Sequence, residues 1–329
     1  MAENSTPDIQ DPGVIVGIDG SNQSMAALGW AADEANRRGT MLTLVTAYTV
    51  PVFAASSMDA GYIAMDDGAI RAGAEAVLKD ALNALSGYSG PVQTVVEVGD
   101  AAGVLVDLSE RAELLVVGSR GRGGFIGRLL GSVSSALPAH AKCGTVVVPI
   151  EYAKHIVERS TAEGKEVGPV VVGVDGSDQG RLASLEAAKA AQCRGTNLVV
   201  VSALPPLGGA VAWLPTMIDE HAITKDIQEK LDAGAAWLRS HYPDLDITTR
   251  LVDGAPVDVL IEETKQAQLT VVGTRGRGGF SGMLLGSTSQ GLLTYAQGPV
   301  LVVPEKNADD PRLQTRKDFG PVFEDGPTQ

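Results

Sequence analysis

The chain has 329 residues, of which 44% are apolar and 4% aromatic, and it carries a formal net charge of −14. This length suits two domains that each bury their own core, and the Gly-, Ala- and Val-rich composition is typical of parallel strands covered by closely packed helices. The acidic balance argues against nucleic acid or an anionic membrane as a partner, because both would repel the chain.

The first half of the chain alternates between short β-branched runs and helical patterns. We predict strands over 14–18, 42–47, 92–98, 114–117 and 145–149, and helices over about 23–38, 66–86 and 102–112 and from about 132 onward. The first strand runs into Asp19-Gly20-Ser21, a turn that favours the start of a helix.

The second half repeats the same order of elements. We predict strands over 170–174, 198–203, 247–252, 269–272 and 300–304, with helices over about 179–194, 219–241 and 256–267 and from 287. A repeat this long indicates two copies of a whole domain. The predicted organisation is a flexible N-terminus (1–12), a first domain (13–150), a polar linker (151–168), a second domain (169–305) and a mobile tail (306–329).

The alternation of strands and helices predicts an α/β fold. Each half is expected to form a doubly wound parallel sheet with strand order 3-2-1-4-5, because right-handed βαβ crossovers connect its strands. In such sheets a ligand binds beyond the carboxyl ends of the strands, where the strand order reverses. In each half that point lies between the first and fourth strands.

A glycine- and arginine-rich loop follows the fourth strand in both halves. Residues 114–132 have the sequence LLVVGSRGRGGFIGRLLGS, and residues 269–287, which lie 155 positions later, have the sequence LTVVGTRGRGGFSGMLLGS. Successive N–H groups in such a loop form an anion nest, and the next helix presents its positive end to the same anion. Neither loop is a Walker A motif, since no lysine precedes Ser132 or Ser287. A purely structural turn remains the alternative.

Two aspartates end the first strand of each half. Asp19 and Asp175 lie in Asp-Gly-Ser turns, and two interpretations of them stay open. Each forms an Asx turn at the start of the next helix, or each binds a ligand such as a ribose hydroxyl or a metal held by phosphates. Both roles are compatible with the same residue.

These motifs together resemble a known family. The pattern Gly118-x-x-Gly121, nine residues, then Gly131-Ser132 is similar to the ATP-binding signature of universal stress proteins. It returns as Gly273-x-x-Gly276, nine residues, then Gly286-Ser287, and the resemblance covers residues 13–150 and 169–305. It implies two tandem five-stranded sheets of the adenine nucleotide α-hydrolase-like type. It also implies that the last strands, 145–149 and 300–304, pair the two halves as a pseudo-dimer.

The resemblance further implies one ATP site in each half, with any Mg²⁺ held through the phosphates rather than by a metal site of the protein. In the first half it assigns to ATP the residues Gly17, Asp19, Ala47, Gly118, Ser119, Arg120, Gly121, Arg122, Gly123, Gly131, Ser132 and Val133. In the second half it assigns Gly173, Asp175, Ala203, Gly273, Thr274, Arg275, Gly276, Arg277, Gly278, Gly286, Ser287 and Thr288. Ser132 is expected either to cap its helix or to bind phosphate. If Arg128 reaches the phosphates, the first site binds more tightly than the second, where Met283 takes its place.

Other features of the sequence exclude further classes. The two cysteines, Cys143 and Cys193, occupy non-equivalent places and belong to no CxxC pair, so we predict neither a disulfide framework nor a thiolate metal site. The first residues lack the charged start and apolar core of a secretory signal, and no apolar run approaches the roughly 20 residues that cross a bilayer. We therefore expect a cytoplasmic protein.

The sequence shows no strong catalytic constellation, since its four histidines are scattered and none lies beside a motif serine. The leading hypothesis is an ATP-binding stress or regulatory protein in which nucleotide occupancy changes conformation or partner binding. The alternatives are a slow ATPase and an interaction scaffold that needs no nucleotide. The protein partner, and any homodimer of whole chains, stay open.

Overall fold

The computed structural model describes residues 11–50, 67–122, 130–152, 168–205, 220–276 and 284–305. The first half contains β1 (Val14–Gly17), α1 (Asn22–Arg38), β2 (Leu42–Tyr48), α2 (Asp67–Ala84), β3 (Val92–Val98), α3 (Ala101–Leu108), β4 (Leu114–Gly118), α4 (Ser132–His140) and β5 (Gly144–Val148). The second half contains β6 (Val170–Gly173), α6 (Asp178–Arg194), β7 (Leu198–Leu204), α7 (Glu220–His241), β8 (Ile247–Asp253), α8 (Pro256–Glu263), β9 (Leu269–Gly273), α9 (Ser287–Tyr295) and β10 (Val300–Val303).

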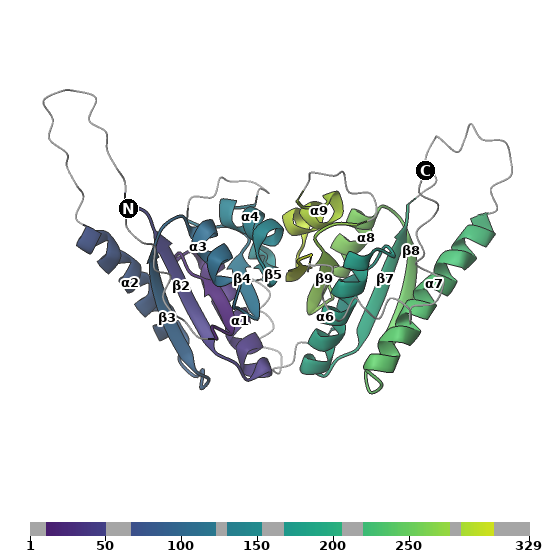
Figure 1. Cartoon of the computed structure of the whole chain (residues 1–329), viewed down its shortest axis with the longest axis horizontal. Coiled ribbons are helices and arrows are strands. Elements are labelled where there is room, and N and C mark those ends of the chain that lie inside the picture. Colours follow the sequence, from purple (N-terminus) through teal and green to yellow (C-terminus); the bar gives the residue numbers. More distant parts are fainter. Residues whose placement is uncertain are drawn as a thin grey trace, which may run out of the picture.

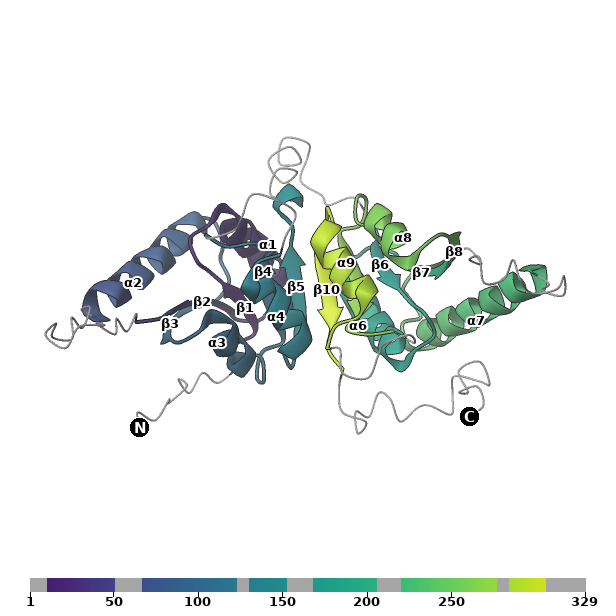
Figure 2. The same ribbon diagram turned by 90° about the horizontal axis from the view of Figure 1, so that it is seen from above.

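The strands form one sheet in the order β3-β2-β1-β4-β5-β10-β9-β6-β7-β8. Each half therefore has the predicted order 3-2-1-4-5, and its neighbouring strands are parallel. The two sheets are not separate, because β5 and β10 pair antiparallel at the middle of the molecule (Figures 1 and 2). Val147 lies opposite Val300, and Thr145 lies opposite Val302. Each of these two strands covers the edge that the other would leave open.

The helices that follow β1 and β6 begin and end in the same way. Ser21 caps α1 by accepting a hydrogen bond from the N–H of Ser24, and Ser177 does the same for α6. Gly39 and Gly195 end these helices in the left-handed conformation, which glycine adopts without steric cost. The caps fix where each helix leaves the sheet, and both helices begin within a residue of the predicted position.

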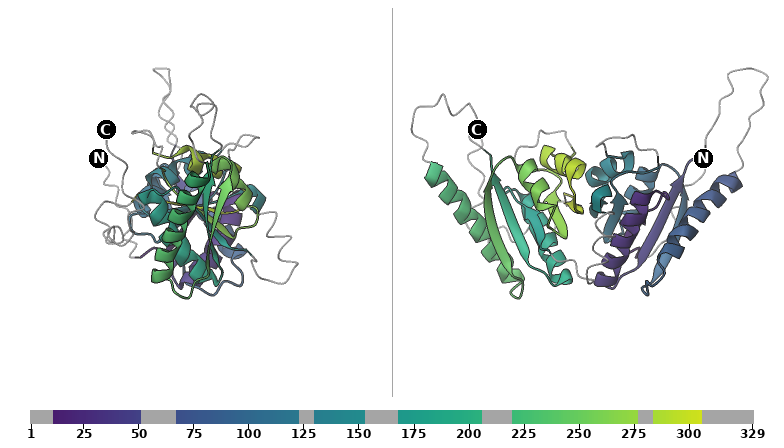
Figure 3. Two further views of the ribbon diagram at one scale, coloured as in Figure 1. Left: turned by 90° about the vertical axis from the view of Figure 1, so that its right-hand side faces the viewer. Right: turned by 180° about the vertical axis from the view of Figure 1, so that it is seen from behind.

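The core has two layers, one on each face of the strands. Alternate residues of β1 point to opposite sides, so that Val14 and Val16 pack with α1 and α2, whereas Ile15 packs with α3 and α4. The second half is built in the same way, with α6 and α7 on one face and α8 and α9 on the other. The long helices α2 and α7 lie at the two outer ends of the molecule (Figure 3).

Two helices are shorter than the sequence predicts. α3 ends at Leu108 and α8 at Glu263, whereas the sequence predicts ends near residues 112 and 267. In both cases the next residue turns its hydroxyl back onto a carbonyl of the last turn: Ser109 donates to Val106, and Thr264 donates to Ile261. These bonds accompany the change from helix to turn.

Most of the predicted N-terminus, linker and tail lie outside the described residues. The first residues assigned to the linker belong to the folded part, since Tyr152 is buried in the core. Within the described ranges, no helix has the length and apolar character that spanning a membrane requires.

Candidate functional site

A cavity of about 580 Å³ opens at the carboxyl ends of β1 and β4 in the first half. This is where the strand order reverses, as the sequence predicts, and the volume lies within the range of small-molecule sites. Of the predicted site residues, the cavity is lined by Gly17, Asp19, Ala47, Gly118, Arg120, Gly121, Arg122, Gly131, Ser132 and Val133.

Asp19 connects the end of β1 to the glycine loop. Its Oδ1 accepts a hydrogen bond of 2.9 Å from the N–H of Ser21, and its Oδ2 accepts one of 2.8 Å from the N–H of Arg122. Burial raises the pKa of Asp19, but the bonds from Ser21 and Arg122 outweigh it and leave the pKa below its usual value. The carboxylate therefore forms the predicted Asx turn and also holds the loop.

Two of the loop glycines are required by their neighbours in the folded chain. A Cβ on Gly121 would lie 2.4 Å from Oδ2 of Asp19, and a Cβ on Gly118 would lie 2.8 Å from the carbonyl carbon of Gln23. Real Cβ atoms do not approach other atoms this closely. Gly118 thus allows β4 to pack against the first turn of α1, and Gly121 allows the loop to reach Asp19.

The helix after the loop begins without a side-chain cap. The N-cap residue of α4 is Gly131, not Ser132, so the prediction that Ser132 caps the helix is wrong. Ser132 and Val133 are the first helical residues, and both line the cavity. The next serine, Ser134, is buried and donates from its hydroxyl to the carbonyl of Ser119, which joins α4 to the end of β4.

A matching cavity of about 560 Å³ lies in the second half. The predicted residues that line it are Gly173, Asp175, Ala203, Gly273, Arg275, Gly276, Gly286, Ser287 and Thr288. A Cβ on Gly276 would lie 2.3 Å from Oδ2 of Asp175, which repeats the contact between Gly121 and Asp19. Gly286 is the N-cap residue of α9 and, like Gly131, makes no side-chain cap hydrogen bond. Buried Ser289 donates to the carbonyl of Gly273.

Several predicted residues do not line their cavities. Ser119 and Thr274 are buried, with 8% and 4% of their surface exposed. Their backbones serve the structure instead: each carbonyl accepts the N–H of the N-cap glycine, Gly131 or Gly286. Gly123, Arg277, Gly278, and the pair Arg128 and Met283 lie outside the described residues.

The sequence did not single out the apolar walls of the two cavities. In the first half these include Val45 of β2, Leu105 of α3 and Val117 of β4, and in the second half Val201, Leu260 and Val272 take the same places. Their alternation along the strands and their helical spacing indicate core positions, and that pattern does not distinguish a cavity wall from a packed core. Only their nearness to the strand ends could have pointed to the site.

The described residues contain no group of three or more His, Cys, Asp or Glu side chains placed to hold a metal ion. The chemistry of each cavity comes from one carboxylate, backbone N–H groups at a helix start, and arginines. Arg120 and Arg122 line the first cavity and Arg275 lines the second, where it also pairs with Glu305. Such a set of donors suits an anionic ligand with hydroxyl groups.

The fold and its repeated cavities define a tandem α/β protein with equivalent cavities at the carboxyl ends of the strands in its two halves. Two segments, residues 13–149 and 166–304, match the model of the universal stress protein family. The chain therefore belongs to the universal stress protein family.

Relatives and solved structures agree with this assignment. The chain is 36% identical over 301 residues to universal stress protein Rv2623 of Mycobacterium tuberculosis, a match that covers 89% of this chain and 96% of the relative. It is 35% identical over 302 residues to a universal stress protein of Mycolicibacterium smegmatis, with 88% and 96% covered. The crystal structure of a universal stress protein from Archaeoglobus fulgidus has the same fold, with a TM-score of 0.63 and 18% identity, and covers 91% of this chain and all of that one.

Proposed function

We propose that each half binds one adenine nucleotide, ATP or its Mg²⁺ complex, and that the protein acts in the stress response through nucleotide-dependent conformation or partner binding. The observation that carries this proposal is the repeated cavity. In both halves an aspartate at the end of the first strand meets a glycine of the loop at the distance where no Cβ fits, and an uncapped helix begins beside them.

The donor groups of each cavity match the parts of a nucleotide. The helix start beside Gly131 offers backbone N–H groups and the positive end of a helix dipole, which favour phosphate. Arg120 and Arg122 add positive charge at the same cavity. Asp19, held ionised by its hydrogen bonds, suits the hydroxyls of a ribose. The apolar walls, among them Val45 and Leu105, suit the face of a base.

The loop supplies the means by which occupancy would change conformation. Near its first end, the N–H of Arg122 donates to the carboxylate of Asp19. After its second end, the N–H of Gly131 donates to the carbonyl of Ser119. A phosphate bound at the helix start would lie beside Gly131, which this hydrogen bond ties to the end of β4. A ligand that favours one arrangement of this loop shifts its population, as any differential contact does.

The sharpest test changes the helix start without disturbing the fold. A Cβ on Gly131 would lie 3.4 Å or more from other atoms, so a Cβ fits at this position. Gly131→Asp supplies a favourable N-cap but places a negative charge where the phosphate is expected. Gly131→Asn supplies the same cap without charge and is the matched control. Gly286→Asp and Gly286→Asn repeat the pair in the second half.

The measurement is isothermal titration with ATP and MgATP, with thermal unfolding of each variant. We expect wild type to bind about two nucleotides per chain, and each aspartate variant to lose the site it alters while the asparagine variant retains it. Neither change should lower the unfolding temperature, because both residues are good caps. Equal ATP binding by Gly131→Asp and wild type would reject the helix start as the phosphate site.

A further inference from the structure

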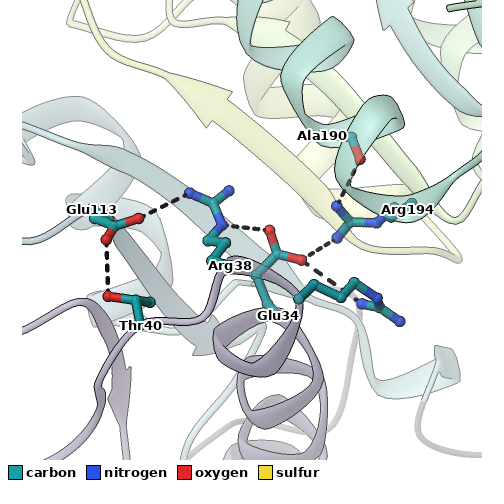
Figure 4. Close-up of polar contacts among 7 residues, drawn as sticks. Glu34, Arg38, Thr40, Glu113, Ala190 and Arg194 are labelled. Carbon is teal, nitrogen blue, oxygen red and sulfur yellow. Dashed lines mark hydrogen bonds and ion pairs between the residues drawn. The ribbon is translucent and has the colours of Figure 1, made fainter.

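A buried cluster of charges joins the C-terminal ends of α1 and α6, far along the chain from each other. Nη2 of Arg194 in α6 lies 2.6 Å from Oε2 of Glu34 in α1 (Figure 4). Both side chains are 1% exposed, so the ion pair is shielded from water. The pair is thus a specific polar contact between the two halves of the molecule, distinct from the strand pairing of β5 with β10.

The first half surrounds this carboxylate with its own arginines. Nε of Arg38 lies 2.7 Å from Oε1 of Glu34, and Nη1 of Arg37 lies 3.7 Å from Oε2. Arg38 also reaches Glu113, which accepts a hydrogen bond from the hydroxyl of Thr40 (Figure 4). Burial raises the pKa of Glu34, but Arg194 and Arg38 outweigh it and keep the pKa below its usual value. Glu34 is therefore a buried, charged hub.

The second half contributes the guanidinium of Arg194, which contacts a carboxylate and an aromatic ring of the first half. The guanidinium of Arg194 lies over the ring of Trp30, 5.5 Å from its centre. From its own helix, Arg194 reaches the carbonyl of Ala190 at 3.3 Å. A buried guanidinium needs such partners, because taking its charge out of water is costly.

The two helices occupy equivalent positions in the repeat, which makes their differences informative. With the shift of 156 residues that aligns α1 with α6, Arg194 corresponds to Arg38. The acceptor differs, since Ala190 stands in the place of Glu34. The aromatic residue differs too, since Glu186 stands in the place of Trp30.

The carboxylate of Glu113, at the outer end of the cluster, also has no equivalent in the second half. Glu113, which pairs with Arg38, corresponds to Gln268 in the second half. Gln268 donates to the carbonyl of Gly168 and so stabilises its own domain. The first half thus holds the hub, the aromatic face and the outer carboxylate. Each half holds an arginine at the equivalent position, and the carboxylate of Glu186 in the second half acts on Arg38.

We propose that this cluster disfavours the pairing of two second halves. The edge strands β5 and β10 are both short, buried and rich in valine, and their main-chain bonds do not distinguish one edge from another. In a pair of two second halves, Arg194 would meet Ala190 and Glu186 where it now meets Glu34 and Trp30. It would lose the hydrogen-bonded carboxylate of Glu34 and the ring of Trp30, and would keep only the carboxylate of Glu186, which now acts on Arg38. The cluster therefore selects the first half as the partner of the second and disfavours pairing of second halves between chains.

The test uses the full chain with a specific protease site inserted within residues 153–167. After folding and purification the chain is cut, and isotope-labelled and unlabelled samples are mixed. Native mass spectrometry then counts pairs of a first with a second half, and pairs of two second halves. For wild type we expect mixed pairs and no pairs of second halves. Glu34→Ala is expected to speed the exchange of halves at least about tenfold, as follows from losing a buried charge partner.

A matched control removes an exposed ion pair of the same kind. Arg71 and Glu75 of α2 are 59% and 56% exposed, and Glu75→Ala should leave the exchange unchanged. A second variant tests selection itself: Glu186→Trp with Ala190→Glu gives the second half the hub and the aromatic face. We expect this double variant to form pairs of second halves. Unchanged exchange in Glu34→Ala, or the absence of such pairs in the double variant, would overturn the proposal.

Discussion

The two cavities of this molecule differ far less than the C-terminal ends of α1 and α6. In both cavities an aspartate meets a glycine of the loop, a glycine precedes an uncapped helix, and a buried serine ties that helix to the preceding strand. At the other ends of α1 and α6, by contrast, Glu34 corresponds to Ala190. The repeat is kept where backbone and ligand would meet, and it has diverged where one half contacts the other.

The largest effect is expected when Glu34 of the first half is replaced by alanine, the residue that the second half has at the equivalent position, Ala190. Glu34→Ala leaves Arg194 and Arg38 without their shared buried carboxylate, which costs about 3 to 5 kcal/mol for a buried pair. We expect a large drop in the midpoint of urea unfolding, measured by circular dichroism. The corresponding change in the exposed pair, Glu75→Ala, should alter stability by less than about 1 kcal/mol. Equal effects of the two changes would contradict the account of the cluster.

Acid should gradually remove the contribution that the ionised Glu34 carboxylate makes to the stability of the fold. Because the pKa of folded Glu34 lies below its ordinary value of 4.5, its contribution is fully present above that value and is lost as pH falls through the folded pKa. The difference in urea midpoint between wild type and Glu34→Gln should therefore shrink between pH 6 and pH 3, a range set by carboxyl pKa values of about 4. A difference that stays constant or grows would show that Glu34 is not the group responsible.

A smaller and more local effect is expected at the loops. Gly121→Ala forces a methyl group onto Asp19, and overpacking of this kind costs about 1 to 3 kcal/mol of stability. Because Asp19 and Gly121 both line the cavity, we also expect weaker ATP binding at this site. Gly276→Ala should do the same to the second site through Asp175. Titration with ATP should show one site weakened and the other unchanged in each variant. Gly29→Ala, where a Cβ would meet nothing within 4 Å, is the control and should leave both sites intact.

The smallest effect should come from a polar difference between the cavity walls near the start of α1 and α6. Ser24 lines the first cavity, and Gly180 occupies its place in the second. The hydroxyl of Ser24 donates to the carbonyl of Ser21, 2.9 Å away, so it is already engaged. We expect Ser24→Gly to change nucleotide affinity at the first site by less than about tenfold, the value of one hydrogen bond. A larger loss would mean that this hydroxyl bonds the ligand directly.

Much of the fold follows from the sequence because its signals are local or repeated. The β-branched runs and their spacing predict the strands within a residue or two, and the crossover rule predicts their order. The convergence of Asp19 with the loop follows from that order, since β1 and β4 are neighbours.

What the sequence could not supply depends on contacts between distant residues. Glu34 has the spacing of an ordinary residue on an amphipathic helix, and its partner Arg194 lies 160 positions away in the other half. The roles of Ser134 and of the N-cap glycine Gly131 also stayed hidden, because a Gly-Ser pair at a helix start points to the serine as the cap. The resemblance assigns Gly118 to ATP, and the structure shows in addition that packing against Gln23 requires a glycine there.

The most direct test of the central claim is the number of nucleotides that one chain holds. Purified protein, saturated with ATP, freed of unbound ligand and then denatured, should release about two equivalents of adenine nucleotide per chain. Gly131→Asp and Gly286→Asp should each release one, and the double variant none. Two equivalents from the double variant, or none from wild type, would contradict the proposal that each half contains a nucleotide site at the start of its fourth helix.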